Sequence, residues 1–222
     1  YNFAMVFGKI EYLNLLPFHV FMKHFTKSNQ QKMSMRYYSG VPAVVNEKFL
    51  TRRVDAAFIS SIRARKFNNV NLGIIAKKEV QSVIAIPSKT NIKDVASATS
   101  NILVDILGVE GEVLIGDRAL RYYLSGGEHI DLAKLWNQKY NLPFVFALLS
   151  FHKDKKLYKR IEKNFIKQRV KIPNYILSDA SKRTGIAKKD ILNYLKCISY
   201  DFDKKAQLGL KAFYSKVDKL KH

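Results

Sequence analysis

Short apolar runs alternate with helix-like stretches along the first 149 residues, and this alternation limits the possible folds more than any other feature. The apolar runs predict strands at residues 6–10, 33–38, 54–59, 72–76, 80–86, 113–115 and 144–149. Helical spacing or a capping residue such as Asp131 predicts helices between them, at residues 15–25, 43–52, 101–107, 118–123 and 131–140. Such alternation is typical of an α/β fold with mainly parallel sheets.

The last third of the chain is expected to be all helix, at residues 152–168, 173–183, 187–198 and 203–220. Residues 150–222 hold 20 Lys and Arg against 7 Asp and Glu, while residues 1–149 hold 19 against 11, so most of the net charge of +21 lies here. Lysines on solvated helix faces explain this excess. Residues 177–191 resemble a helix-turn-helix with Gly185 at the turn, which leaves nucleic-acid binding as an alternative. The region lacks clustered base-reading arginines and a stacking platform, so we expect no nucleic-acid partner.

Several functional classes are excluded or disfavoured. The chain has a single cysteine, Cys197, which rules out a disulfide framework and a multi-cysteine zinc site. His19 and His24 are five residues apart, a poor spacing for a shared metal on one helix. We find no nucleotide-binding glycine loop and no hydrolase or metalloprotease motif, and we expect neither cofactor nor metal. No secretion signal or apolar run of about 18 residues is evident, so a cytoplasmic protein without a membrane partner is expected.

Small polar residues gather where predicted strands end or helices begin. One such junction, residues 12–14, follows the first strand and contains Asn14. The other candidates for binding a ligand are Ser39, Gly40, Ser60, Ser61, Ser97, Thr99, Ser100, Gly116 and Asp117. In α/β sheets such junctions meet at the carboxyl ends of the strands, where helix N-termini offer free N–H groups to carboxylates. Each junction alone could be a simple helix cap, but together they predict a shared cleft for a small anion.

At these same junctions the sequence resembles the chorismate dehydratases of the futalosine route to menaquinone. The resemblance begins at residues 8–18, GKIEYLNLLPF, and continues through GVPAVVN at 40–46 and VDAAFISS at 54–61. Further matching blocks are SATS at 97–100, LIGDRAL at 114–120, DLAKLW at 131–136 and LPFVFA at 142–147. The similarity is strong to about residue 149 and weaker to about residue 213. The order of the blocks, rather than any single one, makes it specific.

The resemblance implies a fold like a type II periplasmic binding protein, in which two α/β lobes enclose a cleft. Residues 1–82 and 146–222 would form the first lobe with the C-terminal helices, and residues 83–145 the second. The family has a further strand and helix where this chain has only residues 108–111. Because losing such a unit would expose an apolar sheet edge, we expect that residues are omitted there rather than that the second lobe is shortened.

The resemblance also implies a function, the dehydration of chorismate to 3-[(1-carboxyvinyl)oxy]benzoate by a hydro-lyase. Asn14 would be the catalytic residue, orienting the enolpyruvyl group or the leaving hydroxyl. The ring carboxylate would be held by nearby amides and by Ser60, Ser61, Ser97 and Thr99. No dedicated base is implied, so a substrate carboxylate could act as its own base, and Asp117 could assist the hydroxyl or merely cap a helix. The alternatives are the sister enzyme that forms 1,4-dihydroxy-6-naphthoate and a non-catalytic protein that binds small anions. Oligomeric state is not predicted.

Overall fold

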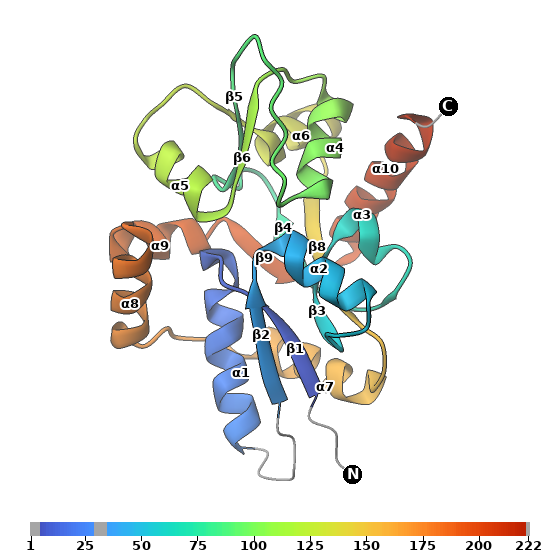
Figure 1. Cartoon of the computed structure of the whole chain (residues 1–222), viewed down its shortest axis with the longest axis vertical. Coiled ribbons are helices and arrows are strands. Elements are labelled where there is room, and N and C mark those ends of the chain that lie inside the picture. Colours follow the sequence, from blue (N-terminus) through green and yellow to red (C-terminus); the bar gives the residue numbers. More distant parts are fainter. Residues whose placement is uncertain (1–4, 29–34, 221–222) are drawn as a thin grey trace.

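The computed structural model describes residues 5–28 and 35–220, which form two β-sheets surrounded by helices (Figure 1). The larger sheet has six strands in the order β2-β1-β3-β8-β4-β9. These strands are β1 (Met5–Ile10), β2 (Met35–Gly40), β3 (Ala56–Ser60), β4 (Asn68–Ala76), β8 (Phe144–Phe151) and β9 (Ile198–Asp201). The smaller sheet has the order β6-β5-β7 and consists of β5 (Val83–Ile86), β6 (Glu112–Ile115) and β7 (Ile130–Asp131). Residues 33–34, which we assigned to the second strand, lie outside the described part of the chain.

Strand directions differ from the sequence prediction. Among the described strands, only β1 pairs with other strands in parallel, with β2 on one side and β3 on the other. Glu112 of β6 also forms an isolated parallel bridge with Ile92. Strand β8 is antiparallel to both β3 and β4, and β9 is antiparallel to β4. Within the smaller sheet, β5 is antiparallel to β6 and β7. The α/β class is therefore confirmed, but the expectation of mainly parallel sheets is wrong, because the chain enters the larger sheet a second time from the opposite direction.

Helices cover both sheets, and most lie where the sequence predicts them. They are η1 (Leu13–Leu15), α1 (Leu16–Ser28), α2 (Pro42–Leu50), α3 (Ser61–Ala64), α4 (Ala98–Leu107), α5 (Gly116–Leu124), α6 (Leu132–Tyr140), α7 (Lys155–Lys167), α8 (Asn174–Thr184), α9 (Lys188–Leu195) and α10 (Lys204–Leu220). Asp131 caps α6 as predicted, with its carboxylate 3.0 Å from the Lys134 N–H. The last third is not all helix, since residues 198–201 form the edge strand β9. None of the helices within the described ranges is long and apolar enough to span a membrane.

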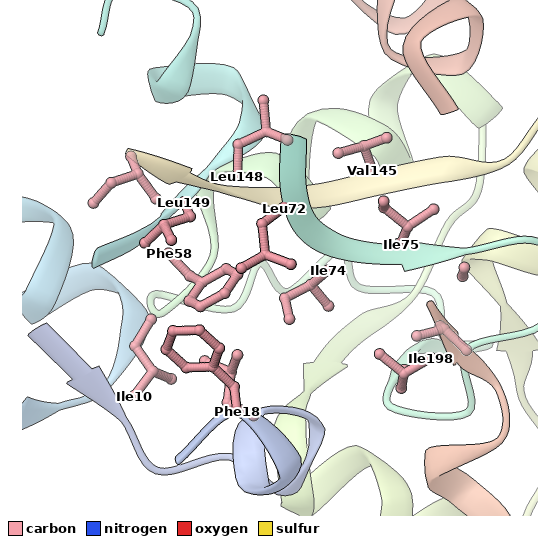
Figure 2. Close-up of a cluster of buried hydrophobic side chains, with 14 of the residues drawn as sticks. Ile10, Phe18, Phe58, Leu72, Ile74, Ile75, Val145, Leu148, Leu149 and Ile198 are labelled. Carbon is pink, nitrogen blue, oxygen red and sulfur yellow. The ribbon is translucent and has the colours of Figure 1, made fainter. Parts of the chain in front are cut away.

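The core of the larger sheet holds α1 against β3 and the strands beside it. Phe18 of α1 is fully buried, and its ring lies 4.9 Å from that of Phe58 on β3 and 5.3 Å from that of Phe165 on α7, measured between centroids. Figure 2 shows Phe18 and Phe58 side by side, with Ile10 of β1 and Leu72 of β4 near them. Burial of each such side chain stabilises the fold by about 1.5–3 kcal/mol. This packing fixes the start of α1, and η1 with it, against the sheet.

The chain passes from α4 to β6 through a tight turn at residues 108–111, without the extra strand and helix that the resemblance led us to expect. Gly108 ends α4 in the left-handed conformation, with φ at +65°. The Val109 N–H donates to the Val104 carbonyl, and the Gly111 N–H donates to the Asn91 side chain. Two backbone N–H groups of the turn thus have hydrogen-bond acceptors within the protein. The smaller sheet has three strands in the described structure.

Helix α10 connects the larger sheet to the helices of the smaller one. Phe213 on α10 contacts the rings of Phe144 on β8 and Trp136 on α6, at 5.0 and 6.3 Å. At Gly209 the helix approaches the Pro143 carbonyl so closely that an added Cβ would lie 2.2 Å from its oxygen. Close packing of this kind fixes the segment that leads from α6 into β8.

Candidate active site

A cavity of about 80 Å³ lies between the two sheets, at the junctions that the sequence singles out. Its polar lining includes five of the predicted residues: Asn14, Ser60, Ser97, Ser100 and Gly116. Its walls are largely apolar and include Ile10, Phe58, Ile74, Val83, Ile115 and Phe146. These residues come from both sheets and from the helices next to them, so the cavity is a cleft between the two halves of the molecule.

Two side-chain atoms in this cleft are buried without a hydrogen-bond partner among the described residues. They are Oδ1 of Asn14 and Oγ of Ser60, and the third such atom is Nε2 of His19, outside the cleft. A buried polar atom left unpaired costs about 1–3 kcal/mol, so native structures rarely contain one without a functional reason. The two oxygens therefore mark where a ligand with hydrogen-bonding groups would fit.

Asn14 is positioned by its backbone. It is the middle residue of η1, which begins where β1 ends, and the Leu15 N–H donates to the Tyr12 carbonyl. The Tyr200 hydroxyl on β9 donates to the Asn14 carbonyl at 2.5 Å. The Leu13 N–H donates to the Asp117 carboxylate of α5 at 3.0 Å. With the backbone held from both sides, the Asn14 side chain is left to face the cavity.

Ser60 is held at the end of β3 by Asn46 of α2. The Ser60 N–H donates to Oδ1 of Asn46 at 3.0 Å, and Nδ2 of Asn46 donates to the Pro42 carbonyl. The neighbouring Ser61 is fully buried and its carbonyl accepts a hydrogen bond from the Tyr214 hydroxyl of α10. The backbone on both sides of the Ser60 hydroxyl is thus fixed.

The N-terminus of α4 also borders the cavity. Oγ of Ser97 accepts from the Ser100 N–H at 3.1 Å and lies 2.7 Å from the Ser100 hydroxyl. Both serines line the cavity. A helix N-terminus carries partial positive charge and free N–H groups, which favour a carboxylate.

The other predicted site residues do not line the cavity. Ser61 and Thr99 are buried, with their hydroxyl oxygens 3.4 Å apart, and Thr99 also accepts from the Ile62 N–H. These contacts join the end of β3 to α4. Ser39 is exposed, with its hydroxyl 3.5 Å from Glu11, and Gly40 ends β2.

Asp117 lies behind the cleft and contacts both of its sides. Besides accepting from Leu13, its carboxylate lies 3.4 Å from the Arg183 guanidinium of α8. Burial raises the pKa of Asp117 above its ordinary value, while the Leu13 N–H and Arg183 oppose that shift. The Asp117 carboxylate of α5 therefore links η1 to α8.

Tyr12 closes one end of the cleft. Gly116 has φ at +66°, and a Cβ added there would lie only 2.6 Å from the Tyr12 ring, so this ring packs directly on the glycine backbone. Tyr12 is the sole titratable side chain among the described residues that line the cavity. Burial and the nearby Asp94 and Asp117 raise its pKa to about 12.

Other titratable groups offer no obvious nucleophile or metal site. No three His, Cys, Asp or Glu side chains within residues 5–28 and 35–220 gather as a metal site would require. Burial raises the pKa of the Cys197 thiol to about 11, which keeps it protonated at neutral pH.

Sequence reasoning missed residues that support the site. Asn46 and Ser82 also line the cavity, and Ser82 accepts a hydrogen bond from the buried Tyr194 hydroxyl at 2.7 Å. Asn46 could have been identified as a candidate from the sequence, because asparagine is unfavourable inside a helix and here it interrupts an apolar stripe. Tyr200 had no such signal, since its partner, the Asn14 carbonyl, is 186 positions away in the chain.

Comparison with known proteins agrees with this geometry. The family model described as menaquinone biosynthesis matches residues 106–219. A curated chorismate dehydratase from Campylobacter jejuni is 44% identical over 213 residues, which cover 94% of this chain and 96% of the relative. A chorismate dehydratase from Thermus thermophilus is 25% identical over an alignment of 260 positions, which covers 94% of this chain and 93% of the relative.

Solved structures show the same fold at low sequence identity. An Archaeoglobus fulgidus protein superposes with a TM-score of 0.73 at 12% identity, over 98% of both chains. The periplasmic aliphatic sulphonate binding protein of Escherichia coli has a TM-score of 0.59 at 13% identity, over 96% of this chain and 92% of its own. The predicted periplasmic-binding-protein-like fold is therefore confirmed. Together with the 44% identical relative, these findings show that the chain belongs to the menaquinone biosynthesis family that contains the chorismate dehydratases.

Proposed function

We propose that this protein is a chorismate dehydratase, a carbon–oxygen lyase that converts chorismate to 3-[(1-carboxyvinyl)oxy]benzoate and water. The reaction removes the ring proton from the carbon that bears the enol ether and the hydroxyl from the neighbouring carbon. The ring becomes aromatic, which drives the reaction. Because both curated relatives carry this name, the dehydratase is favoured over the naphthoate-forming enzyme and over a non-catalytic binding protein.

The observation that carries the proposal is the unpartnered Oδ1 of Asn14. This atom can only accept a hydrogen bond, so its partner must be a donor. At neutral pH the single donor on chorismate is the ring hydroxyl, the group that leaves. Asn14 would therefore orient the leaving hydroxyl, and the Ser60 hydroxyl, which can donate or accept, would bind next to it.

The ring carboxylate would lie at the N-terminus of α4, beside Ser97 and Ser100. As the ring proton departs, negative charge spreads through the conjugated diene onto this carboxylate. Donors fixed in advance around a developing charge lower the barrier, and loss of one such donor typically reduces kcat by about 10²–10³. Gly116 would act on the cleft by letting the Tyr12 ring pack against its backbone.

The proton acceptor would be the substrate itself. The described lining holds no carboxylate, imidazole or amine, and its one titratable group is Tyr12, which stays protonated at neutral pH. The enolpyruvyl carboxylate of chorismate is tethered next to the ring proton. Holding it in reach would replace a protein base, and correct positioning can contribute about 7–11 kcal/mol.

The remaining predicted residues would act on the shape of the cleft. We propose that Ser61, Thr99 and Asp117 fix the two halves relative to each other, and that Ser39 and Gly40 lie at the entrance side of β2. A cavity of about 150 Å³ holds benzene. The present 80 Å³ is smaller, so chorismate would enter by separation of η1 from α5 at the Tyr12 and Gly116 contact.

Turnover of purified protein with chorismate tests the proposal directly. The diene absorbance should disappear, and mass spectrometry should detect the aryl enol ether. Asn14→Ala should lower kcat by about 100-fold or more, since misplacing a reacting group typically costs that much. Asn164→Ala, at a half-buried asparagine on α7 that does not line the cleft, is the matched control and should turn over normally. Absence of turnover by the wild type, or conversion of only the substrate of the naphthoate-forming enzyme, would overturn the assignment.

A further inference from the structure

A second, larger depression lies on the other side of Tyr12. It is a groove of about 470 Å³ between α1, the strands β1 and β2, and α8. Helices α1 and α8 lie side by side in Figure 1, and the Lys23 side chain of α1 contacts Tyr175 of α8. Tyr12 lines both this groove and the cleft, so its side chain forms the wall between them. The dehydration proposed above makes no use of this groove.

Positive charge predominates in the groove. Four cationic side chains line it, Lys9, Lys23, Lys27 and Arg183, against the carboxylates of Glu11 and Asp179. Lys9 lies 3.3 Å from Glu11, and Arg183 lies 3.4 Å from Asp117 behind the cleft. The balance of these charges favours an anionic ligand.

His19, at the base of the groove, has a buried ring nitrogen without a partner. Its Nε2 contacts no hydrogen-bonding group of the described residues. Burial, with the positive charges of Lys9 and Arg183, lowers the pKa of His19 to about 3, so the ring is neutral. A neutral imidazole can still donate one N–H, and a ligand oxygen between Lys9 and Arg183 would accept it.

The rest of the groove is apolar and partly aromatic. Leu16 and Val20 of α1 and Ile176 of α8 form its walls, with Tyr12 and Tyr37 beside them. Apolar walls with a few polar groups at one point are the usual composition of a small-molecule site, and the volume lies within the usual range of about 300–1,000 Å³. Such walls suit a hydrocarbon ring better than an inorganic ion.

We propose that this groove is a second binding site, which takes an aryl or cyclic carboxylate. The carboxylate lies between Lys9 and Arg183 and accepts the N–H of His19, and the ring packs against Leu16, Val20 and Ile176. Two sources fit this chemistry: the aryl carboxylate product of the dehydration, or an unrelated metabolite of the same class. The site itself does not depend on the proposed reaction.

Histidine ring signals in nuclear magnetic resonance spectra test the site. Protein labelled with ¹⁵N-histidine is titrated with sodium benzoate, and separately with acetate, at constant ionic strength. His19→Phe identifies the His19 signal by its loss. In the wild type this signal should move saturably with benzoate and far less with acetate.

Variants of the groove and of the cleft show in which of the two benzoate binds. Lys9→Gln and Arg183→Gln should each weaken benzoate binding by about tenfold, the effect of losing one charge-assisted hydrogen bond. Lys205→Gln, an exposed lysine on α10, is the control and should bind as the wild type does. Asn14→Ala, which alters only the cleft, should keep the His19 shift.

Three results would overturn the proposal: no movement of the His19 signal at benzoate concentrations of tens of millimolar, wild-type affinity for benzoate in both Lys9→Gln and Arg183→Gln, or loss of the shift in Asn14→Ala. A parallel titration with the dehydration product identifies the source. Tighter binding than benzoate indicates the product, and equal or weaker binding indicates another aryl carboxylate. Chorismate turnover, measured on the same preparations, reports separately on the proposed function.

Discussion

Tyr12 contributes to several features of this molecule. Its ring packs on Gly116, separates the cleft from the groove, and is the one titratable group of the described cleft lining. Burial and the nearby carboxylates of Asp94 and Asp117 raise its pKa to about 12, so the hydroxyl is neutral at any pH at which the protein would work. The chemistry of the cleft is therefore not expected to depend on ionisation of the protein.

Chorismate turnover should be nearly independent of pH. Because Tyr12 stays protonated and no other lining group titrates, we expect kcat to be flat between about pH 6 and pH 10. Tyr12→Phe should keep the same flat profile even if kcat itself falls. Steady-state kinetics across this range, with unfolding monitored at each pH, is the measurement. A bell-shaped profile with an apparent pKa near 7 would show that a protein base takes part.

His19 should make the fold less stable in acid. Its pKa is lowered to about 3 by burial, Lys9 and Arg183, whereas in the unfolded chain it is about 6.5. The unfolded state therefore binds the proton first, and stability is lost as pH falls from about 6.5 toward the folded pKa. Between about pH 7 and pH 5, the Tm of His19→Phe should fall by less than the Tm of the wild type. His24→Phe, on the same helix, serves as the control, and equal losses in wild type and His19→Phe would contradict the assignment.

At the scale of elements, the sequence was most informative where apolar runs are bounded by turn residues. Strands β1, β3 and β6 and the capped helix α6 lie where the patterns predict them. Strand β9 was missed because its short run, Ile198–Asp201, directly follows the amphipathic helix α9 and has no turn signal in front of it. Strand direction was missed because pairing depends on where the chain returns, which no local pattern contains.

The site was predictable to a similar degree. Five residues that were selected because they lie where strands end or helices begin do line the cleft: Asn14, Ser60, Ser97, Ser100 and Gly116. The contacts that orient them join distant parts of the chain, as Tyr200 does with Asn14, and tertiary contacts of this kind leave no mark in a single sequence. Whether each predicted residue binds substrate, and whether the lobes divide at 82/83 and 145/146, stay predictions.

The contact between η1 and α5 should depend on the absence of a side chain at Gly116. Gly116→Ala would place Cβ against the Tyr12 ring, and it would also strain a residue with φ at +66°. Gly126 has a similar φ of +77° but open space around it, so Gly126→Ala carries the strain without the clash. Each variant should lose about 1–2 kcal/mol of unfolding free energy from strain.

Only Gly116→Ala should also lower kcat/KM, by about tenfold or more, because it shifts η1 and Asn14 with it. Denaturant unfolding and steady-state kinetics of both variants check this pair of expectations. Equal kcat/KM in the two variants would mean that the Tyr12 contact does not position the site.

At the scale of the whole molecule, the positive charge is unevenly distributed. Residues 150–222 carry 20 Lys and Arg against 7 Asp and Glu. Most of these lysines lie on the exposed faces of α7 to α10 rather than in the described cleft lining. Their field would attract a dianionic substrate to the molecule without holding it in the cleft.

Salt should therefore affect the binding of substrate from solution more than the chemical step. Raising ionic strength from about 20 to 300 mM should lower kcat/KM for chorismate several-fold, because the attraction is screened, and should leave kcat nearly unchanged. Kinetics at several salt concentrations, with Tm measured in each buffer, separates screening from unfolding. An equal fall in kcat would place the salt effect inside the cleft.

The strand order of the larger sheet also determines when that sheet can form during synthesis. Strand β8 lies between β3 and β4, yet it is made only after the whole of the smaller sheet. On the ribosome, the smaller sheet can close early, whereas β3 and β4 keep open apolar edges until Phe151 has emerged. Unpaired edges of this kind favour association with other chains, so this risk would end for the β3 and β4 edges only when β8 pairs between them.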